Sequence, residues 1–302
     1  ATPNAADMLL VVQAATVEYF GGWYIGATAL FTILCLVLAV LPGTGSQRLG
    51  MPDTRPEFSR FAWFSMMFGA GIGVGMLTYS TAEPLYHFGN NPDVIMGHAE
   101  AYTVSNVGPA YKWTLLHYGL TPWACYAVVG LSLAYFSYRR DMPLTIRSPF
   151  SAMLGQRSST VVGAFVDTAA ILATLIGIAV TIGYGVTQLA FGAHHITHWA
   201  WLIEENQPTK LALAAAVGII VLAAMMSALS GLGRGIKWLS NLNMVLSWVL
   251  LLIFLVFGAT LFAGEVFVQG IYDYLVALPA MSSTIWSDSS TQKDLALAQW
   301  QS

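Results

Sequence analysis

Four glycines occupy alternate positions of the apolar segment FGAGIGVGMLTYSTAEPLYHF, residues 68–88. Each glycine inside a helix costs about 1 kcal/mol relative to alanine, so a helix that only had to cross a bilayer would avoid this pattern. Close helix packing through small-xxx-small pairs is one explanation, but residues at alternate positions cannot all lie on one packing face. The segment therefore predicts an unwound, closely approachable backbone at Gly69, Gly71, Gly73 and Gly75.

Polar side chains follow these glycines and indicate what an unwound segment could do. The next positions carry hydroxyl groups and one carboxylate, at Thr78, Ser80, Thr81 and Glu83. Such groups are costly in hydrocarbon unless they face a cavity or a partner. Irregular backbone is tolerated at membrane depth where it lines a water-filled cavity, and secondary transporters build substrate and cation sites from it. This segment is therefore the first candidate binding element.

A second candidate is the segment HYGLTPWACY, residues 117–126, in which Pro122 predicts a kink. Tyr118 precedes the kink, whereas Trp123 and Tyr126 are three residues apart and share a helix face after it. Aromatic rings hold quaternary ammonium groups by cation–π attraction. The same residue types also form the aromatic belt at a membrane–water interface, so the pattern alone leaves both interpretations open.

Two pairs of histidines could bind a metal or carry protons. His194 and His198 have the i,i+4 spacing of a metal pair, but no third ligand is evident nearby. We therefore expect no metal site at this pair. His87 and His117 could carry protons, although ordinary interfacial histidines are the more common case.

Two carboxylates lie within apolar segments. Glu83 is interpreted as a structural group, because Pro84 follows it and an interrupted helix would expose backbone groups for it to bond. Asp167 lies near one end of its segment and is expected to cap a helix or pair with a loop arginine. No nucleophile and base converge in a motif, so the sequence does not indicate an enzyme.

The composition indicates a membrane protein. Of the 302 residues, 56% are hydrophobic and only 9% are charged, whereas soluble domains contain about 25% charged residues. The mean hydropathy is +0.64. A net charge of -3 without a Lys/Arg cluster gives no indication of a nucleic-acid partner. Cys35 and Cys125 both lie in apolar stretches, so neither suggests a disulfide framework.

Six apolar runs reach the length of roughly 20 residues that a bilayer requires. They cover residues 22–42, 61–86, 113–137, 161–191, 211–230 and 239–263. Of the 12 Lys and Arg residues, nine lie in the first, third and fifth connections, and three lie in the alternate connections and tails. By the positive-inside rule, both ends of the sequence are predicted to face outside.

The two ends are expected to lie in the membrane interface. Residues 1–21 have apolar residues at helical spacing together with Asp7 and Glu18, and they lack the basic region of a signal peptide. They are interpreted as an outer interfacial segment before a transmembrane helix at 22–42. Residues 264–302 begin with aromatics mixed with a few polar groups, which is typical of an interfacial helix and a following loop.

Four segments together resemble the betaine/carnitine/choline transporter (BCCT) family. They are the two segments above, YRRDMPLTIRS at 138–148 and GLGRGIKWLSNLNMVLS at 231–247. The resemblance implies an all-α polytopic membrane protein with a LeuT-like inverted-repeat fold, usually a homotrimer in a bacterial inner membrane. Residues 61–263 would form the first repeat of five transmembrane helices. The second repeat, beginning with a Trp-rich span, would lie beyond residue 302, so we expect this sequence to be part of a longer chain.

The resemblance also implies a site for a small onium compound. Glycine betaine, choline, carnitine, trimethylamine N-oxide and dimethylsulfoniopropionate are the candidates. Trp123 and Tyr126 match residues of the family's aromatic box, and Tyr118 stands where tryptophan is common. The unwound segment would contribute to the same substrate site through Gly71, Gly73 and Gly75.

Sodium is the coupling ion that the resemblance implies, with no other cofactor. The carbonyl groups of Gly69 and Ile72, and the hydroxyl of Thr174, stand where sodium-coupled members bind cations. Ile178 replaces a second threonine, which departs from the pattern for a second sodium ion. Proton-coupled choline members tend to carry Asp where this sequence has Gly75, and this difference favours sodium.

The sequence therefore predicts a sodium-coupled symporter that imports an onium osmolyte by alternating access. Two alternatives remain open: a proton-coupled choline-type transporter, and a non-transporting membrane subunit of a larger complex. A channel is less well supported, because the polar residues cluster in one interrupted helix instead of forming a continuous pore lining.

Overall fold

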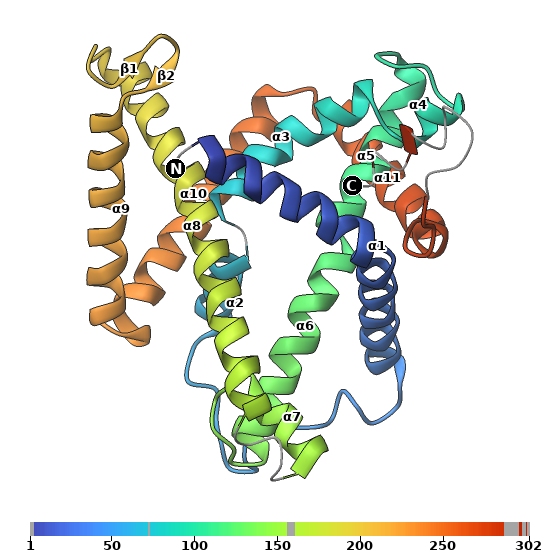
Figure 1. Cartoon of the computed structure of the whole chain (residues 1–302), viewed down its shortest axis with the longest axis vertical. Coiled ribbons are helices and arrows are strands. Elements are labelled where there is room, and N and C mark those ends of the chain that lie inside the picture. Colours follow the sequence, from blue (N-terminus) through green and yellow to red (C-terminus); the bar gives the residue numbers. More distant parts are fainter. Residues whose placement is uncertain (1–2, 72, 156–160, 287–295, 298–299, 301–302) are drawn as a thin grey trace. The chain divides into compact units, whose positions relative to one another are not determined.

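The computed structural model describes residues 3–71, 73–155, 161–286, 296–297 and 300. These residues are helical almost throughout (Figure 1). A helix satisfies its own backbone hydrogen bonds, which hydrocarbon requires. Within the described residues, six helical stretches are long and apolar enough to span a membrane. They are Asp7–Val40, Val104–Arg139, Val161–Thr197, Lys210–Leu229, Leu232–Phe257 and Thr260–Met281.

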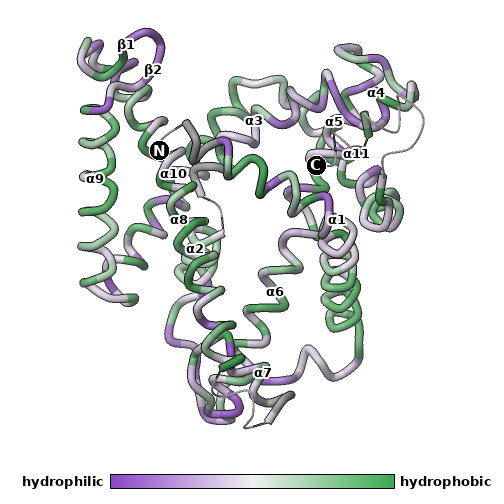
Figure 2. Tube along the Cα trace, viewed as in Figure 1, coloured by the Kyte–Doolittle hydropathy of each residue, from purple (hydrophilic) through white to green (hydrophobic). Residues whose placement is uncertain are grey.

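The long helices consist largely of apolar residues, and Figure 2 shows much of their length in the hydrophobic colour, with paler and hydrophilic turns between. Large apolar side chains remain exposed along them, for example Phe257 at 83% and Leu229 at 84%. A soluble protein rarely exposes contiguous apolar patches of this extent, whereas lipid is a favourable environment for them. The chain is an all-α polytopic membrane protein, as the sequence predicted.

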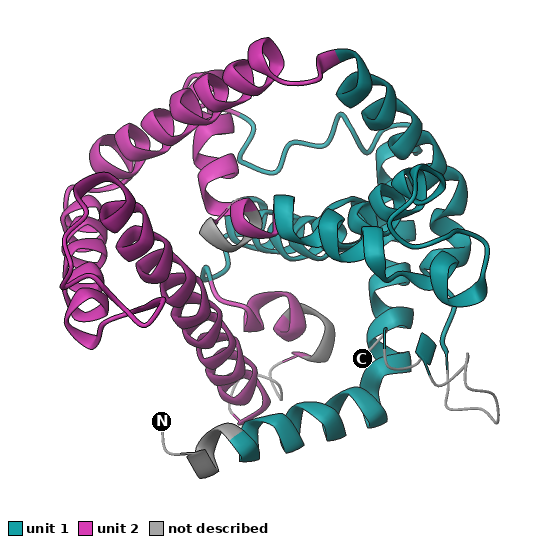
Figure 3. Ribbon diagram, turned by 90° about the horizontal axis from the view of Figure 1, so that it is seen from above, with its two compact units in different colours: residues 1–52, 81–144, 261–302 teal, residues 53–80, 145–260 magenta. Residues whose placement is uncertain are grey.

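The chain divides into two compact units, which Figure 3 distinguishes by colour. Unit 1 comprises residues 1–52, 81–144 and 261–302, and unit 2 comprises residues 53–80 and 145–260. The elements of unit 1 are α1 (Pro3–Val40), α4 (Pro92–Met96), η1 (Val104–Asn106), α5 (Val107–Tyr118), α6 (Leu120–Ala134), η2 (Tyr135–Arg139) and nearly all of α11 (Thr260–Met281). The elements of unit 2 are α2 (Arg60–Gly71), α7 (Arg147–Leu154), α8 (Val161–Thr197), β1 (Ile203–Glu204), β2 (Gln207–Pro208), α9 (Lys210–Leu229), η4 (Leu232–Ile236) and α10 (Lys237–Phe257). Helix α3 (Val74–Gly89) begins in unit 2 and ends in unit 1.

Unit 1 is built on the packing of α1 along α6 and of α5 against α6. Two fully buried asparagines fix the connection from α3 to α5. The Asn91 amide donates to the carbonyl oxygen of His87 (2.6 Å) and to Asn106 Oδ1 (2.8 Å). The Asn106 amide donates to the carbonyl oxygen of Phe88 (2.6 Å). Asn91 Oδ1 also caps α4 by accepting from the N–H of Val94 (3.1 Å), so buried polar groups here are satisfied locally.

Unit 2 is built on the packing of α2 along α10 and of α8 along α9. A hairpin of two short antiparallel strands, β1 and β2, connects α8 to α9. Its turn residues Glu205 and Asn206 have φ values of 47° and 62°, as a type I′ turn requires. At the other end of α8, Asp167 accepts from the N–H of Arg147 (3.1 Å) and pairs with its guanidinium (3.2 Å). The predicted pairing of Asp167 with a loop arginine is confirmed.

The helices at the two ends differ from the predicted boundaries. One continuous helix, α1, covers the expected interfacial segment 1–21 from Pro3 onward and most of the expected span 22–42. Figure 1 shows that α1 is bent, and it contains the pair Gly21–Gly22, a common cause of kinks. Helix α11 is long and apolar enough to span, where the sequence predicted an interfacial helix. Whether either segment lies in the interface stays a prediction.

Candidate functional site

The glycine-rich segment interrupts the helix, but over a shorter stretch than its sequence predicted, because Gly69, Gly71 and Gly75 lie within helices and only Gly73 of the four does not. Helix α2 ends at Gly71, Gly73 lies outside any helix, and α3 begins at Val74. Gly75 lies in the first turn of α3, and Ile72 lies outside the described residues. The last four carbonyl groups of a helix have no partner within it, and Gly69 is among them. The Gly73 carbonyl instead accepts from the N–H of Leu77 (3.3 Å) at the start of α3.

Neighbouring helices approach two of these glycines. A Cβ added to Gly73 would lie 3.3 Å from Thr181 Cγ2 on α8, and one added to Gly69 would lie 3.4 Å from Ser240 Oγ on α10. The distance at Gly73 is tight, so the Thr181 side chain would have to shift by a few tenths of an ångström, whereas that at Gly69 is an ordinary van der Waals contact. The glycines thus allow α8 and α10 to pack directly against backbone.

A polar seam joins the start of α3 to α8 within unit 2. The side-chain amide of Gln188 donates to Thr78 Oγ1. The hydroxyl oxygens of Tyr79 and Tyr184 lie 3.0 Å apart, and their rings meet edge to face at 5.7 Å. Of the hydroxyls that follow the glycines in the sequence, that of Thr78 therefore has a partner on α8, whereas that of Ser80 donates to the carbonyl oxygen of Leu77 (2.7 Å) on its own helix.

Sequence reasoning identified Thr174 on this helix but missed the other polar residues of its face. Thr174, Thr181 and Gln188 are spaced by seven residues, so they lie along one side of α8. This spacing was the signal that could have identified them. Thr181 is the residue that reaches Gly73. Thr174 lies two turns away along α8, about 10 Å at 1.5 Å per residue, and its hydroxyl donates to the carbonyl of Ala170 (2.7 Å).

The aromatic pair lies just after a second interruption, in unit 1. Helix α5 ends at Tyr118 and α6 begins at Leu120, so Pro122 is the third residue of α6. Proline is tolerated in a first turn because its missing N–H would have no partner there. The predicted irregularity is confirmed, but it falls at Gly119.

Trp123 and Tyr126 lie together, as their spacing predicted, with ring centroids 5.6 Å apart and planes tilted by 38°. The indole N–H of Trp123 donates to the carbonyl oxygen of Tyr118 (3.0 Å), which the end of α5 leaves without a helical partner. The polar edge of the Trp123 ring is therefore hydrogen-bonded, and the residue is partly buried. Tyr126 is 64% exposed.

The backbone carbonyl of Tyr118 contacts the pair, and its side chain contacts Glu83. Its hydroxyl donates to Glu83 Oε2 (2.7 Å). Glu83 Oε1 contacts His87 Nε2 (3.4 Å) and also His117 Nδ1. Glu83 was expected to bond backbone groups exposed by the interruption, but its contacts are with side chains. The physical reason is that the break lies at 71–74, and α3 runs unbroken through Pro84 to Gly89.

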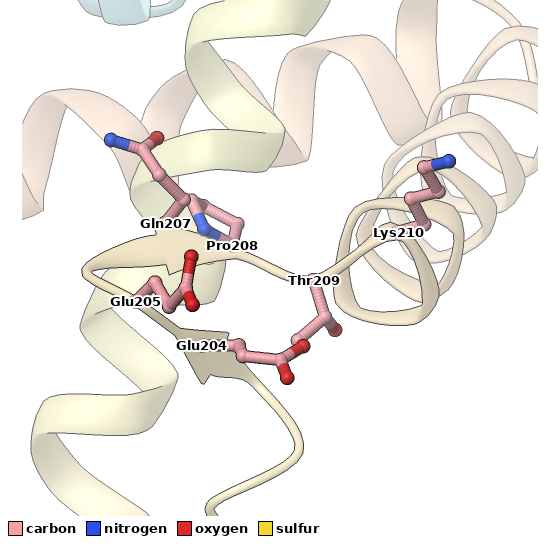
Figure 4. Close-up of a pocket in the computed structure, with 6 residues that line it drawn as sticks. All are labelled: Glu204, Glu205, Gln207, Pro208, Thr209 and Lys210. Atoms are coloured by element: carbon pink, nitrogen blue, oxygen red, sulfur yellow. The ribbon is translucent and has the colours of Figure 1, made fainter.

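The His194–His198 pair does not form a metal site among the described residues. Helix α8 ends at Thr197, and His198 has a left-handed φ of 55°, so the two rings do not share a helix face. The Nδ1 of His194 lies 3.0 Å from the carbonyl oxygen of Trp199. A shallow hollow nearby, at the hairpin, is lined by Glu204, Glu205, Gln207, Pro208, Thr209 and Lys210 (Figure 4). These residues offer no aromatic ring to hold an onium group.

Comparison with known proteins gives matches over most or all of the chain. The family model described as "BCCT, betaine/carnitine/choline family transporter" matches residues 1–302. The chain is 37% identical over 263 residues to the osmo-dependent choline transporter BetT2 of Acinetobacter baylyi, covering 87% of this chain and 36% of that protein. It is 36% identical over 271 residues to the glycine betaine transporter OpuD of Bacillus subtilis, covering 89% and 50%. It is 37% identical over 254 residues to the high-affinity choline transport protein of Escherichia coli, covering 84% and 36%.

The chain thus spans between 36% and 50% of the length of these curated relatives. The relatives are transporters and not enzymes, and those named here are bacterial.

Proposed function

This chain belongs to the betaine/carnitine/choline transporter family, and on that premise we propose that the protein containing it is a secondary active symporter for an onium osmolyte. The main supporting observation is the interruption of an apolar helix between Gly71 and Val74. Backbone groups left without helical partners at such a break are suited to bind an ion or a polar substrate group. A helix that served only as a membrane anchor would have no need of it.

The proposed substrate carries a trimethylammonium or related onium group. Trp123 and Tyr126 offer two adjacent rings, 5.6 Å apart, from an apolar helix. Cation–π attraction is worth about 2 kcal/mol at a desolvated ring. Glycine betaine and choline are the first candidates, because relatives carry these names. Carnitine, trimethylamine N-oxide and dimethylsulfoniopropionate have the same recognition chemistry.

The proposed coupling ion is Na⁺, bound at the carbonyl oxygens where α2 ends. Gly69 is one of the residues whose carbonyl lacks a helical partner. Carbonyl and hydroxyl oxygens are the ligands that hard cations prefer, and Ile72 and Thr174 are the other proposed contributors. Sodium and substrate are coupled if both favour the same conformation. For the whole protein we infer a LeuT-like inverted-repeat fold, alternating access and a homotrimer from the family alone.

The test is uptake by the full-length protein in proteoliposomes. Radiolabelled glycine betaine, choline and dimethylsulfoniopropionate are offered under an imposed sodium or proton gradient. We expect sodium-dependent accumulation of at least one compound. Trp123→Ala should raise KM about 30-fold, since 2 kcal/mol corresponds to that ratio. Trp238→Ala, at a 64% exposed tryptophan of α10, is the matched control and should leave KM unchanged.

Each other result would revise a different part of the proposal. Uptake driven by a proton gradient would support the proposed substrate class and would refute the proposed sodium site at Gly69, Ile72 and Thr174. Equal effects of the two tryptophan substitutions would refute the aromatic site. The absence of gradient-driven uptake of every onium compound would refute the transport function and favour a subunit of a larger complex.

A further inference from the structure

One group of metal-ligating side chains plays no part in the proposed transport cycle. Glu83 and His87 lie one turn apart on α3, and His117 lies near the end of α5. One ligand atom from each lies within 4.8 Å of the other two. All three residues belong to unit 1. Within the described part of the chain, this is the group of His, Cys, Asp and Glu side chains close enough to share an ion.

His87 lies between a backbone carbonyl and Glu83. Its Nδ1 is 3.5 Å from the carbonyl oxygen of Asn90, a distance at the limit of hydrogen bonding. Its Nε2 is 3.4 Å from Glu83 Oε1. With the hydrogen on Nδ1, the electron pair of Nε2 would face Glu83 and be available to a cation that both groups share.

A bound metal would satisfy this arrangement. Metal-ligating histidines usually donate their second N–H to a carbonyl or a carboxylate, which fixes the ring, and Asn90 supplies that carbonyl for His87. In a tetrahedral zinc site with bonds of about 2.0–2.1 Å, neighbouring ligand atoms lie about 3.3–3.4 Å apart. The separation of 3.4 Å between His87 Nε2 and Glu83 Oε1 matches that geometry. His117 Nδ1 and Glu83 Oε1 are in direct hydrogen-bond contact, so the His117 ring would move away from Glu83 when both bind the ion.

The surroundings hold the ligands and leave one side accessible. Tyr118 donates to Glu83 Oε2 (2.7 Å), whereas Oε1 is the oxygen that both histidines contact. The Trp300 ring stacks on His117 at 6.2 Å and lies 5.7 Å from His87. The His87 side chain is 3% exposed, whereas that of His117 is 49% exposed. An ion can therefore enter from the His117 side and retain a water ligand.

We propose that Glu83, His87 and His117 bind one divalent transition-metal ion of the zinc class, which ties α3 to α5. Two imidazoles and one carboxylate favour such an ion over Na⁺, Mg²⁺ or Ca²⁺, whose preferred ligands are oxygens. The site lies on the helix that begins directly after the glycine interruption. No metal site other than one for sodium was expected from the sequence, so this assignment departs from that prediction.

The test measures metal binding by the full-length protein in detergent, purified without a histidine tag. Zn²⁺ is titrated in competition with a chromophoric chelator, and Co²⁺ replaces it for visible absorption spectroscopy. We expect one equivalent of Zn²⁺ per chain and the absorption bands of a four-coordinate Co²⁺ centre. His117→Ala should weaken Zn²⁺ binding by at least tenfold, and Glu83→Gln should do the same.

His98→Ala is the matched control, because its ring is 65% exposed and lies near Asp93 (3.9 Å), outside the group. It should bind Zn²⁺ as tightly as the unsubstituted protein. His117 is preferred to buried His87 for substitution, and size-exclusion chromatography checks that each variant is folded. Zinc binding that His98→Ala reduces as much as His117→Ala would overturn the site, as would no binding by the unsubstituted protein. The measurement uses no substrate and no gradient, so its outcome is independent of the transport test.

Discussion

Gly119 separates α5 from α6, and we predict that Gly119→Ala will disrupt this junction. Its φ is −93°, so left-handed strain is not involved, and the obstacle is space. A Cβ at this position would lie 2.5 Å from the carbonyl oxygen of Leu115 and 2.6 Å from the hydroxyl oxygen of Tyr274. Relief of the first contact requires a shift of the backbone of α5, and relief of the second requires a shift of the Tyr274 ring.

The cost follows from what those two atoms already do. Tyr274 is 4% exposed, and its hydroxyl accepts from the N–H of Leu120 (2.7 Å). The Leu115 carbonyl accepts from the N–H of Gly119 (2.7 Å). Displacing Tyr274 leaves a backbone donor unsatisfied, at about 1–3 kcal/mol, and moving the helix end costs about as much. At roughly 2–4 °C per kcal/mol, a 2 kcal/mol loss would lower the apparent Tm by about 4–8 °C.

The assay is thermal unfolding of the detergent-purified full-length protein, followed by intrinsic fluorescence. Gly130→Ala on α6 is the matched control, because a Cβ there meets nothing within 4 Å, and alanine raises helix propensity by about 1 kcal/mol. Its apparent Tm should stay constant or rise. Equal Tm values for the two alanine variants would refute the argument that Gly119 is required by close approach.

Three further predictions concern other contacts, each read from the same unfolding assay. Asn91→Ala removes a helix cap and two buried amide hydrogen bonds and should lower the free energy of unfolding by about 2–4 kcal/mol. The control, Asn90→Ala, removes an exposed amide bonded to a tyrosine hydroxyl and should change the apparent Tm by no more than about 1–2 °C. A similar loss in both variants would contradict the importance of the buried network. Gly73→Ala should lower the apparent Tm because the added Cβ would lie 3.3 Å from Thr181 Cγ2. A second substitution, Thr181→Ser, deletes that methyl group and should recover most of the loss. If the Tm does not recover, the contact between these two side chains is not the cause of the loss. Asp167→Ala removes a helix cap and a half-exposed ion pair and should lower the free energy of unfolding by about 1 kcal/mol. Asp167→Asn should retain the part of this stability that is due to the cap. Identical losses of stability in the two variants would assign the whole effect to the charge.

The sequence by itself determined the membrane class and the places where helices break. Low charge and long apolar runs are properties of composition, and they predict helices because hydrocarbon leaves no other way to satisfy the backbone. The four alternating glycines predicted an interruption, which the structure places between Gly71 and Val74. Pro122 predicted another, although it falls at Gly119 because proline fits the first turn of α6.

The sequence also placed Trp123 beside Tyr126, because residues three apart on a helix must share a face. It could in principle have indicated the polar face of α8, since Thr174, Thr181 and Gln188 recur every seven residues. It could not say which of them meets the glycines. That depends on how far along α8 the start of α3 packs, and packing depends on side chains of both helices together.

Only the tertiary structure decided the partners of Glu83. Its i,i+4 relation to His87 is visible in the sequence, but His117 is 34 residues away and Tyr118 is 35 residues away. They meet because the buried amides of Asn91 and Asn106 turn the chain between α3 and α5. A carboxylate next to a proline has no local preference for such partners. Its surroundings depend on where the packing of α3 and α5 brings the two imidazoles.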